Sequence, residues 1–308
     1  MNTPARRIVS LLPSATEIVC ALGLGDRLIA VTHECDYPPD ARSKPRVTVS
    51  AFDPTSLSSY EIDRAVRESL VDQATIYHLD RDLIEDLEPD LILTQELCTV
   101  CAVGTDEVKA LVEELPVRPQ LVSLEPQTLG DVFDSMLLVG RLTGRFRRAF
   151  ELTAELRARV EGVREAVSAE PVRKVLTLEW LDPFFVGGHW VPEMVEIAGG
   201  CDVLGEVGKP SREASQEEVV RSAADVVVAM PCGYGLDRSL DELATFCSPI
   251  GWNELPAVGR GEVYAVDGSS YFSRPGPRLV DGVEILASIL HPDVWTKAPV
   301  GSFDRVAG

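Results

Sequence analysis

A helix followed by a fully buried strand occurs twice in this sequence, and the repeat restricts the chain to a small group of folds. The segments DRDLIEDLEPDLILT (80–94) and SQEEVVRSAADVVVA (215–229) each begin with a good helix-capping residue, Asp80 or Ser215. Each ends in an apolar run that is typical of a strand covered on both faces. Two such units predict an α/β fold with two similar Rossmann-like lobes.

The starts of the two halves also match, because RIVSL near residue 7 parallels RKVLTL near residue 173. The alternative is that αβ units look alike without being repeats. The first half is longer, and its extra length contains SSYEIDRAVRESL, which predicts an added helix. We therefore expect an N-terminal α/β lobe over residues 1–127, a helical connector over 128–169 and a C-terminal α/β lobe over 170–308.

The connector contains apolar residues at helical spacing after Gly144. They are Phe146, Phe150, Leu152, Leu156, Val160, Val163 and Val167. A helix of about 24 residues would be roughly 36 Å long, enough to run from one lobe to the other. A long connecting helix predicts a stiff hinge and a ligand cleft between the lobes that opens only slightly.

Composition excludes several classes of protein. The net charge of −20 argues against non-specific nucleic-acid binding, because the phosphates would be repelled. We find no run of about 18 uncharged apolar residues and so predict no transmembrane segment. The seven cysteines are an odd number and are scattered except for one close pair, which is unlike a small disulfide-stapled domain.

The opening residues, RIVSLLPSATEIVCALGLGD, combine arginine with an apolar run, as an export leader does. However, Pro13 and Glu17 interrupt the run, and no convincing Ala-x-Ala cleavage site follows. A strand and then a helix with a capping box of Ser14 and Glu17, ended by Gly23, accounts for more of the residues. The chain as written is therefore expected to be cytoplasmic, whereas an upstream leader would place it in the periplasm or at the cell surface.

These features together resemble the periplasmic-binding-protein superfamily with a helical backbone, the ligand-capturing partners of cobalamin, haem and ferric-siderophore importers. The resemblance covers almost the whole chain and is greatest to the cobalamin-binding group. The segments that carry it are RIVSLLPSATEIVCALGLGDRLIAVT, LEPDLILTQ, the LTG connector, SQEEVVRSAADVVV and GEVYAVDGSSYFSRPGPRLVDGVEILASILHP. It implies a corrinoid as the small-molecule ligand and an ABC permease as the partner; we expect the chain to be a monomer.

Ligand-binding residues are expected in the loops after strand C-termini. The segment LEWLDPFFVGGHW (178–190) is crowded with aromatic residues, and a flat, largely apolar macrocycle needs such walls. We expect Phe185 to point into the core, with Trp180 and Trp190 in contact with the ligand. We expect Arg274 either to bind a carboxamide or phosphate edge or to form a structural ion pair. The candidates in this lobe are Trp180, Phe184, Gly188, His189, Trp190, Tyr271, Phe272 and Arg274.

The first lobe offers His33 after one predicted strand, and Gln95, Cys98 and Cys101 after another. Three interpretations of the Cys98–Cys101 pair compete: buried unreactive thiols, contact with the ligand or its cobalt, and a separate metal or redox site. A single Cys-x-x-Cys is a weak signal for structural zinc. The identity of any metal is therefore unknown, and Cys98, Cys101 and His33 are its candidate ligands.

The resemblance also implies that one acid at the tip of each lobe meets arginines of the permease. By position these are Asp82 and Glu217, although acids are favoured at helix N-termini by the helix dipole alone. Asp82 is shorter than the glutamate usual in the family.

The sequence contains no nucleophile elbow, Walker loop or paired-carboxylate motif, so we expect no enzymatic activity. Cobalamin is then a bound ligand and not a catalytic cofactor. The alternatives are a haem or ferric-siderophore binding protein, and a cytosolic metal or redox protein that uses Cys98 and Cys101.

Overall fold

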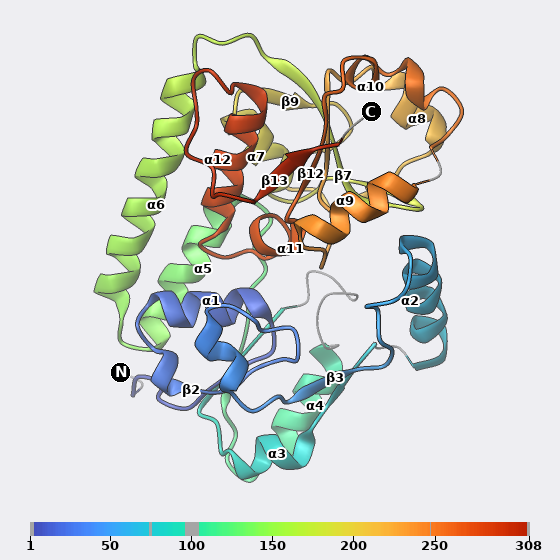
Figure 1. Cartoon of the computed structure of the whole chain (residues 1–308). Coiled ribbons are helices and arrows are strands. Elements are labelled where there is room, and N and C mark those ends of the chain that lie inside the picture. Colours follow the sequence, from blue (N-terminus) through green and yellow to red (C-terminus); the bar gives the residue numbers. More distant parts are fainter. Residues whose placement is uncertain (1–2, 74–75, 96–104, 247, 307–308) are drawn as a thin grey trace. The chain divides into compact units, whose positions relative to one another are not determined.

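The computed structural model describes residues 3–73, 76–95, 105–246 and 248–306. The chain forms two compact α/β units, which confirms the expected fold class (Figure 1). The first unit consists of Met1–Leu57, Glu61–Pro126 and Gly130–Ala154. The second unit consists of Ser58–Tyr60, Gln127–Leu129 and Glu155–Gly308.

The first unit is built on a parallel sheet with the strand order β2-β1-β5-β6. Its strands are β1 (Ile8–Ser10), β2 (Leu28–Ala30), β5 (Leu91–Thr94) and β6 (Gln120–Ser123). A separate antiparallel pair is formed by β3 (Thr48–Ser50) and β4 (Tyr77–Leu79). The central strands β1 and β5 are buried along their whole length, as their apolar runs predict.

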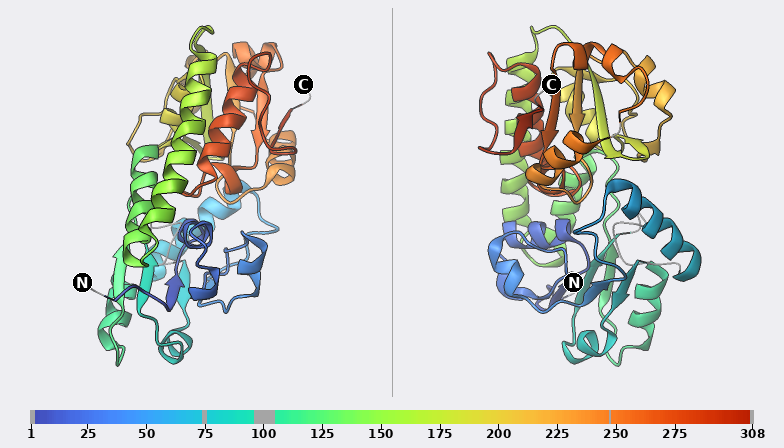
Figure 2. Two further views of the ribbon diagram at one scale, coloured as in Figure 1. Left: turned by 90° about the vertical axis from the view of Figure 1, so that its left-hand side faces the viewer. Right: turned by 45° about the vertical axis from the view of Figure 1, so that its right-hand side comes forward.

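Helices lie around this sheet (Figure 2), and two short 3₁₀ helices precede and follow β2 in the sequence. The helices are α1 (Pro13–Ala21), α2 (Ser59–Gln73), α3 (Arg81–Asp86), α4 (Thr105–Glu114) and α5 (Leu129–Leu142), and the 3₁₀ helices are η1 (Gly25–Arg27) and η2 (Pro39–Ser43). The helix predicted from SSYEIDRAVRESL is therefore confirmed as α2.

The second unit contains a mixed sheet with the order β10-β8-β7-β11-β12-β13, and β9 pairs with the start of β7. Its strands are β7 (Arg173–Leu181), β8 (Phe184–Val186), β9 (Gly200–Asp202), β10 (Arg212–Glu213), β11 (Val226–Ala229), β12 (Val263–Val266) and β13 (Phe303–Arg305). The three central strands β7, β11 and β12 are parallel, so their carboxyl ends lie at one edge.

The helices of this unit are α7 (Val191–Ile197), α8 (Gln216–Arg221), α9 (Leu236–Thr245), α10 (Pro256–Gly259), α11 (Gly268–Tyr271) and α12 (Leu279–Leu290), with the 3₁₀ helix η3 (Trp252–Glu254). Residues of β7, β8, β11 and β12 share one core with Trp252 and Leu255. The rigid sheet fixes where each connecting loop begins and ends.

The helix α1 begins differently from the prediction. Its N-cap residue is Leu12, whose side chain makes no capping hydrogen bond, and Pro13 occupies the first turn. Ser14 and Glu17 lie inside the helix and are buried, so the predicted capping box is wrong. Proline at this position sets the helical φ and has no N–H that needs a partner, so it favours a helix start here without a capping side chain. The predicted end is confirmed, because Gly23 follows the helix with φ +72°.

The two repeated segments fold as predicted, with Asp80 and Ser215 as capping residues. The aspartate before each buried strand plays the same part in both units. Asp90 accepts hydrogen bonds from the backbone N–H groups of Arg6 and Arg7, and Asp225 accepts one from Lys174. Each aspartate therefore fastens the start of its own strand to the start of the neighbouring strand.

The connector contains the helix α6 (Phe146–Val167), which passes from the first unit to the second at Ala154 (Figure 1). Its 22 residues span about 33 Å. Five predicted apolar positions, from Leu152 to Val167, are buried, whereas Phe146 and Phe150 are 43% and 60% exposed. In the second unit Arg159 binds Asp281 and Glu284 of α12.

Candidate functional site

The segments 178–190 and 267–274 of the second unit carry all of its predicted ligand-binding residues, and the segment 230–238 is hydrogen-bonded to both. We call the three segments the carboxyl-end loops. Backbone hydrogen bonds connect them: Cys232 N–H donates to Glu179 C=O (3.1 Å), and Ser269 N–H donates to Tyr234 C=O (3.0 Å). The indole N–H of Trp190 donates to Phe272 C=O at 2.8 Å. Segments far apart in the sequence thus form one continuous layer.

Trp180 is half-buried and packs edge-on against Tyr234, with ring centroids 5.3 Å apart. Its indole N–H donates to the C=O of Ser59, which belongs to the same unit. The Arg238 guanidinium lies 3.8 Å from the centroid of the Tyr234 ring. Tyr234 is 2% exposed, and burial raises its pKa.

Sequence reasoning missed Tyr234 and Arg238. Both follow the buried strand β11, and a position just after a strand end is the sequence signal that identifies them.

The predicted orientation of the two adjacent phenylalanines is reversed. Phe184 is 5% exposed and packs with Trp252 and Phe246 in the core, while Phe185 is part exposed. Alternation along a strand requires one inward and one outward residue, and the register β7–β8 decides which. Trp190 and Phe272 are also buried, at 5% and 2% exposed.

Glu179 shapes the turn that carries the predicted residues Gly188 and His189. Its carboxylate accepts hydrogen bonds from Gly188 N–H (3.0 Å) and from the Ser211 hydroxyl (2.5 Å). A methyl group on Gly188 would lie 2.2 Å from the backbone nitrogen of Ser211. The close approach that this glycine permits is therefore made by the chain's own backbone.

His189 is half-buried, and its backbone adopts φ +51°. Its ring stacks on Trp190 with centroids 5.5 Å apart, and Nδ1 lies 3.0 Å from Oε1 of Gln127. Burial lowers the pKa of His189, so the ring is neutral at neutral pH. Tyr271 and Arg274 complete the layer and are both part exposed; the Arg278 guanidinium lies 5.7 Å from the Tyr271 ring centroid.

In the first unit His33 and Gln95 follow β2 and β5. Nδ1 of His33 lies 2.7 Å from the Thr48 hydroxyl, and its ring centroid is 5.2 Å from that of Tyr77. Burial, with a smaller effect of Arg46, lowers the pKa of His33. Gln95 is 6% exposed, and among the described residues its Oε1 has no hydrogen-bond partner.

Cys98 and Cys101 lie outside the described residues. Within the described ranges, no group of three or more His, Cys, Asp or Glu side chains could hold a metal ion. The thiol–metal interpretations of Cys98 and Cys101 stay predictions.

Asp82 and Glu217 are both exposed in the first turns of α3 and α8. Glu217 forms an ion pair with Arg221 at 2.7 Å, within its own helix. Each acid is thus available at the surface of its own unit. No helix in the described ranges is long and apolar enough to cross a membrane.

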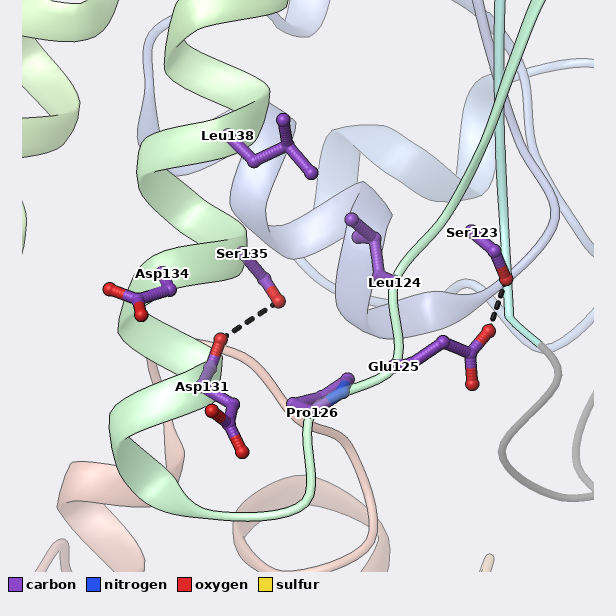
Figure 3. Close-up of a pocket in the computed structure, with 8 residues that line it drawn as sticks. All are labelled: Ser123, Leu124, Glu125, Pro126, Asp131, Asp134, Ser135 and Leu138. Atoms are coloured by element: carbon purple, nitrogen blue, oxygen red, sulfur yellow. Dashed lines mark hydrogen bonds between the residues drawn. The ribbon is translucent and has the colours of Figure 1, made fainter.

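A pocket of about 340 Å³ in the first unit lies between β6 and α5 (Figure 3). Its walls are mainly polar and acidic: Ser123, Leu124, Glu125, Pro126, Asp131, Asp134, Ser135 and Leu138. A pocket of equal volume in the second unit lies beside Arg173 and His291. Neither pocket contains an aromatic wall or a predicted ligand-binding residue, so we place the candidate site on the carboxyl-end loops.

Comparison with known proteins covers nearly the whole chain. A family model described as "Periplasmic binding protein" matches residues 8–269. The chain is 25% identical over 300 residues to an uncharacterized ABC transporter substrate-binding lipoprotein of Bacillus subtilis, covering 94% of this chain and 81% of the relative. It is 24% identical over 290 residues to a vitamin B12-binding protein of Vibrio cholerae, covering 93% and 90%.

Among solved structures, a periplasmic heme-binding protein of Pseudomonas aeruginosa has the same fold. Its TM-score is 0.73 at 20% sequence identity, with 99% of this chain and 100% of that chain covered. This likeness supports the two-lobed architecture.

Proposed function

We propose that this chain, which belongs to the periplasmic binding protein family, binds a cobalamin-type corrinoid and delivers it to an ABC permease. The observation that carries the proposal is the layer of Trp180, His189 and Tyr271 on the carboxyl-end loops, in a chain with a vitamin B12-binding relative. All three side chains are only partly buried, so they are open to a ligand.

The part-exposed residues supply complementary chemistry for a corrinoid. The faces of Trp180 and Tyr271 suit the apolar macrocycle, and the Arg274 guanidinium suits a carboxamide or phosphate at its edge. Trp190, Phe272 and Phe184 are buried behind them and hold the loops in place. His33 and Gln95 of the first unit stay candidate ligand contacts.

Binding is proposed to occur without chemical change to the ligand, as is general in this family. The corrinoid is then cargo, not a catalytic cofactor.

The rival proposals differ in the ligand or in the chemistry. A haem or ferric siderophore would use the same fold, and the structural likeness to a heme-binding protein makes haem the second ligand to test. A metal or redox function through Cys98 and Cys101 would require those thiols for binding and would not require Trp180 or Tyr271.

Calorimetric titration with cyanocobalamin, haem and a ferric catecholate siderophore tests the proposed function. We expect saturable binding of cyanocobalamin with one site per chain and no saturable binding of the siderophore. Saturable binding of haem alone would identify haem as the ligand in place of cobalamin. No binding of any of the three would refute ligand capture by this layer.

A role in import requires the chain to lie on the outer side of the membrane, where it meets the permease. We propose this location from its relatives, one of which is a lipoprotein. Cell fractionation with antibodies against the chain tests it, and a purely cytosolic distribution would favour the leaderless alternative.

A further inference from the structure

The backbone of His189 is held in a conformation that residues other than glycine rarely adopt. Its φ is +51°, and the neighbouring segment fixes it from both sides. The His189 N–H donates to Lys209 C=O at 2.5 Å, and its C=O accepts from Gly208 N–H at 2.8 Å. Such strain persists only where the surroundings over-determine it, and it gathers at ligand-binding positions.

The imidazole ring of His189 is fixed as firmly as its backbone. It stacks on Trp190, and Trp190 is locked in turn by its hydrogen bond to Phe272 C=O. Nδ1 faces the acceptor oxygen of Gln127 at 3.0 Å, so Nδ1 carries the proton.

The other ring nitrogen, Nε2, therefore presents a lone pair. Nε2 makes no hydrogen bond within the described residues. It is also absent from the fully buried atoms there that lack a hydrogen-bond partner, so Nε2 is not fully buried. A metal-binding histidine usually donates its other ring N–H to a carboxylate, a backbone carbonyl or water, and the side-chain oxygen of Gln127 is an acceptor of the same kind. In the same unit the ring of His291 differs, because its Nε2 lies 3.4 Å from Gly199 C=O.

We propose that Nε2 of His189 binds the metal at the centre of the captured ligand, the cobalt of a corrinoid, with Gln127 as the positioning residue. The inference rests on the proposed function and adds a coordinate bond to it. The Nε2–cobalt bond forms as the cobalt–oxygen bond to an exchangeable water breaks; water leaves, and the oxidation state of cobalt does not change. Imidazole is a suitable ligand for this class of metal.

Aquocobalamin and cyanocobalamin together test this coordination. Aquocobalamin carries an exchangeable water, so ligation by His189 should shift its visible absorption bands on binding. Cyanocobalamin carries a tightly bound cyanide at that position, so its spectrum should not change. The wild type should bind aquocobalamin at least about tenfold more tightly than cyanocobalamin.

Variants assign the spectral shift to one atom. His189→Asn should abolish the shift and weaken aquocobalamin binding at least about tenfold more than it weakens cyanocobalamin binding; asparagine tolerates a positive φ and preserves the turn. Gln127→Leu should weaken aquocobalamin binding about tenfold. Losses of this size or larger are typical when a metal-binding histidine loses its hydrogen-bond partner. His78→Ala, on the exposed edge of β4, is the control and should behave as wild type.

The outcomes separate this inference from the proposed function. An unchanged spectral shift in His189→Asn would overturn the inference, as would a shift lost only in Cys98→Ser/Cys101→Ser. Equal loss of cyanocobalamin and aquocobalamin affinity in His189→Asn would assign Nε2 to a hydrogen bond and also overturn it. If the wild type binds neither corrinoid, the proposed function fails and the coordination fails with it.

Discussion

Gly188 is a single residue on which the geometry of the His189 turn depends. Because its Cβ position is occupied by the backbone of Pro210 and Ser211, Gly188→Ala forces the two segments apart. We expect a loss of about 1–3 kcal/mol in the free energy of unfolding, the usual cost of overpacking. Chemical denaturation measures it.

Gly162→Ala is the matched control for that substitution. Gly162 lies inside α6, and a methyl group there would meet nothing within 4 Å. The control should gain about 0.5–1 kcal/mol, because alanine is the better helix former. A Gly188→Ala protein as stable as the wild type would show that the turn is loosely packed.

The burial of His189 should make the stability of the folded state depend on pH. Burial disfavours the charged imidazolium, so His189 should titrate below the value of about 6.5 for a free histidine. The folded state then loses stability relative to the unfolded state as the pH falls below about 6.5, because the unfolded chain takes up the proton first. NMR titration of the His189 ring measures the midpoint; a value above 6.5 would contradict the burial argument.

Residue types were easier to predict than their orientations. The aromatic crowding in 178–190 identified the right segment, but the register of β8 against β7, which no local pattern reveals, put Phe184 inside and Phe185 outside. Gln127 was not predicted because it lies 62 residues from His189 in the sequence. Contacts at that separation follow from the fold and not from spacing.

Asp90 fastens the strand β5 to the start of the strand β1. Its carboxylate accepts hydrogen bonds from Arg6 N–H at 2.8 Å and Arg7 N–H at 3.0 Å. Asp90→Ala removes both, and at about 0.5–1 kcal/mol for each bond we expect a loss of about 1–2 kcal/mol. Thermal and chemical unfolding measure the change.

Asp86→Ala is the control for Asp90, because Asp86 is exposed and its side chain makes no hydrogen bond or ion pair within the part of the chain that the structure describes. An acid at a helix C-terminus is unfavourable, so this variant should be as stable as the wild type or slightly more stable. Equal effects of the two substitutions would show that Asp90 contributes only general charge.

The buried strands and capped helices were predictable because each has a local signature. The runs at 91–94 and 226–229 are apolar throughout and lie in the middle of parallel sheets. The strand β10 is only Arg212–Glu213, both exposed, and forms because β8 offers a free edge. In α6 the periodic residues indicated a helix, but exposed Phe146 and Phe150 show that periodicity does not reveal what covers each turn.

At the scale of the whole molecule, delivery to a permease should depend on Asp82 and Glu217. The double variant Asp82→Arg/Glu217→Arg should lose binding to a corrinoid ABC permease in proteoliposomes while keeping its ligand affinity. The control, Asp86→Arg/Glu254→Arg, makes the same change of net charge at two other exposed acids and should bind normally. Undiminished permease binding by the first variant would show that both acids only stabilise their own helices.

In the proposed complex, the carboxyl-end loops of the second unit hold the corrinoid. The most direct measurement is the calorimetric affinity of Trp180→Ala/Tyr271→Ala for cyanocobalamin, with Phe150→Ala as the control because that ring is 60% exposed on α6. We predict at least about tenfold weaker binding by the double variant, as expected for the loss of aromatic anchors, and wild-type affinity for the control. Wild-type affinity in a folded double variant would contradict the account.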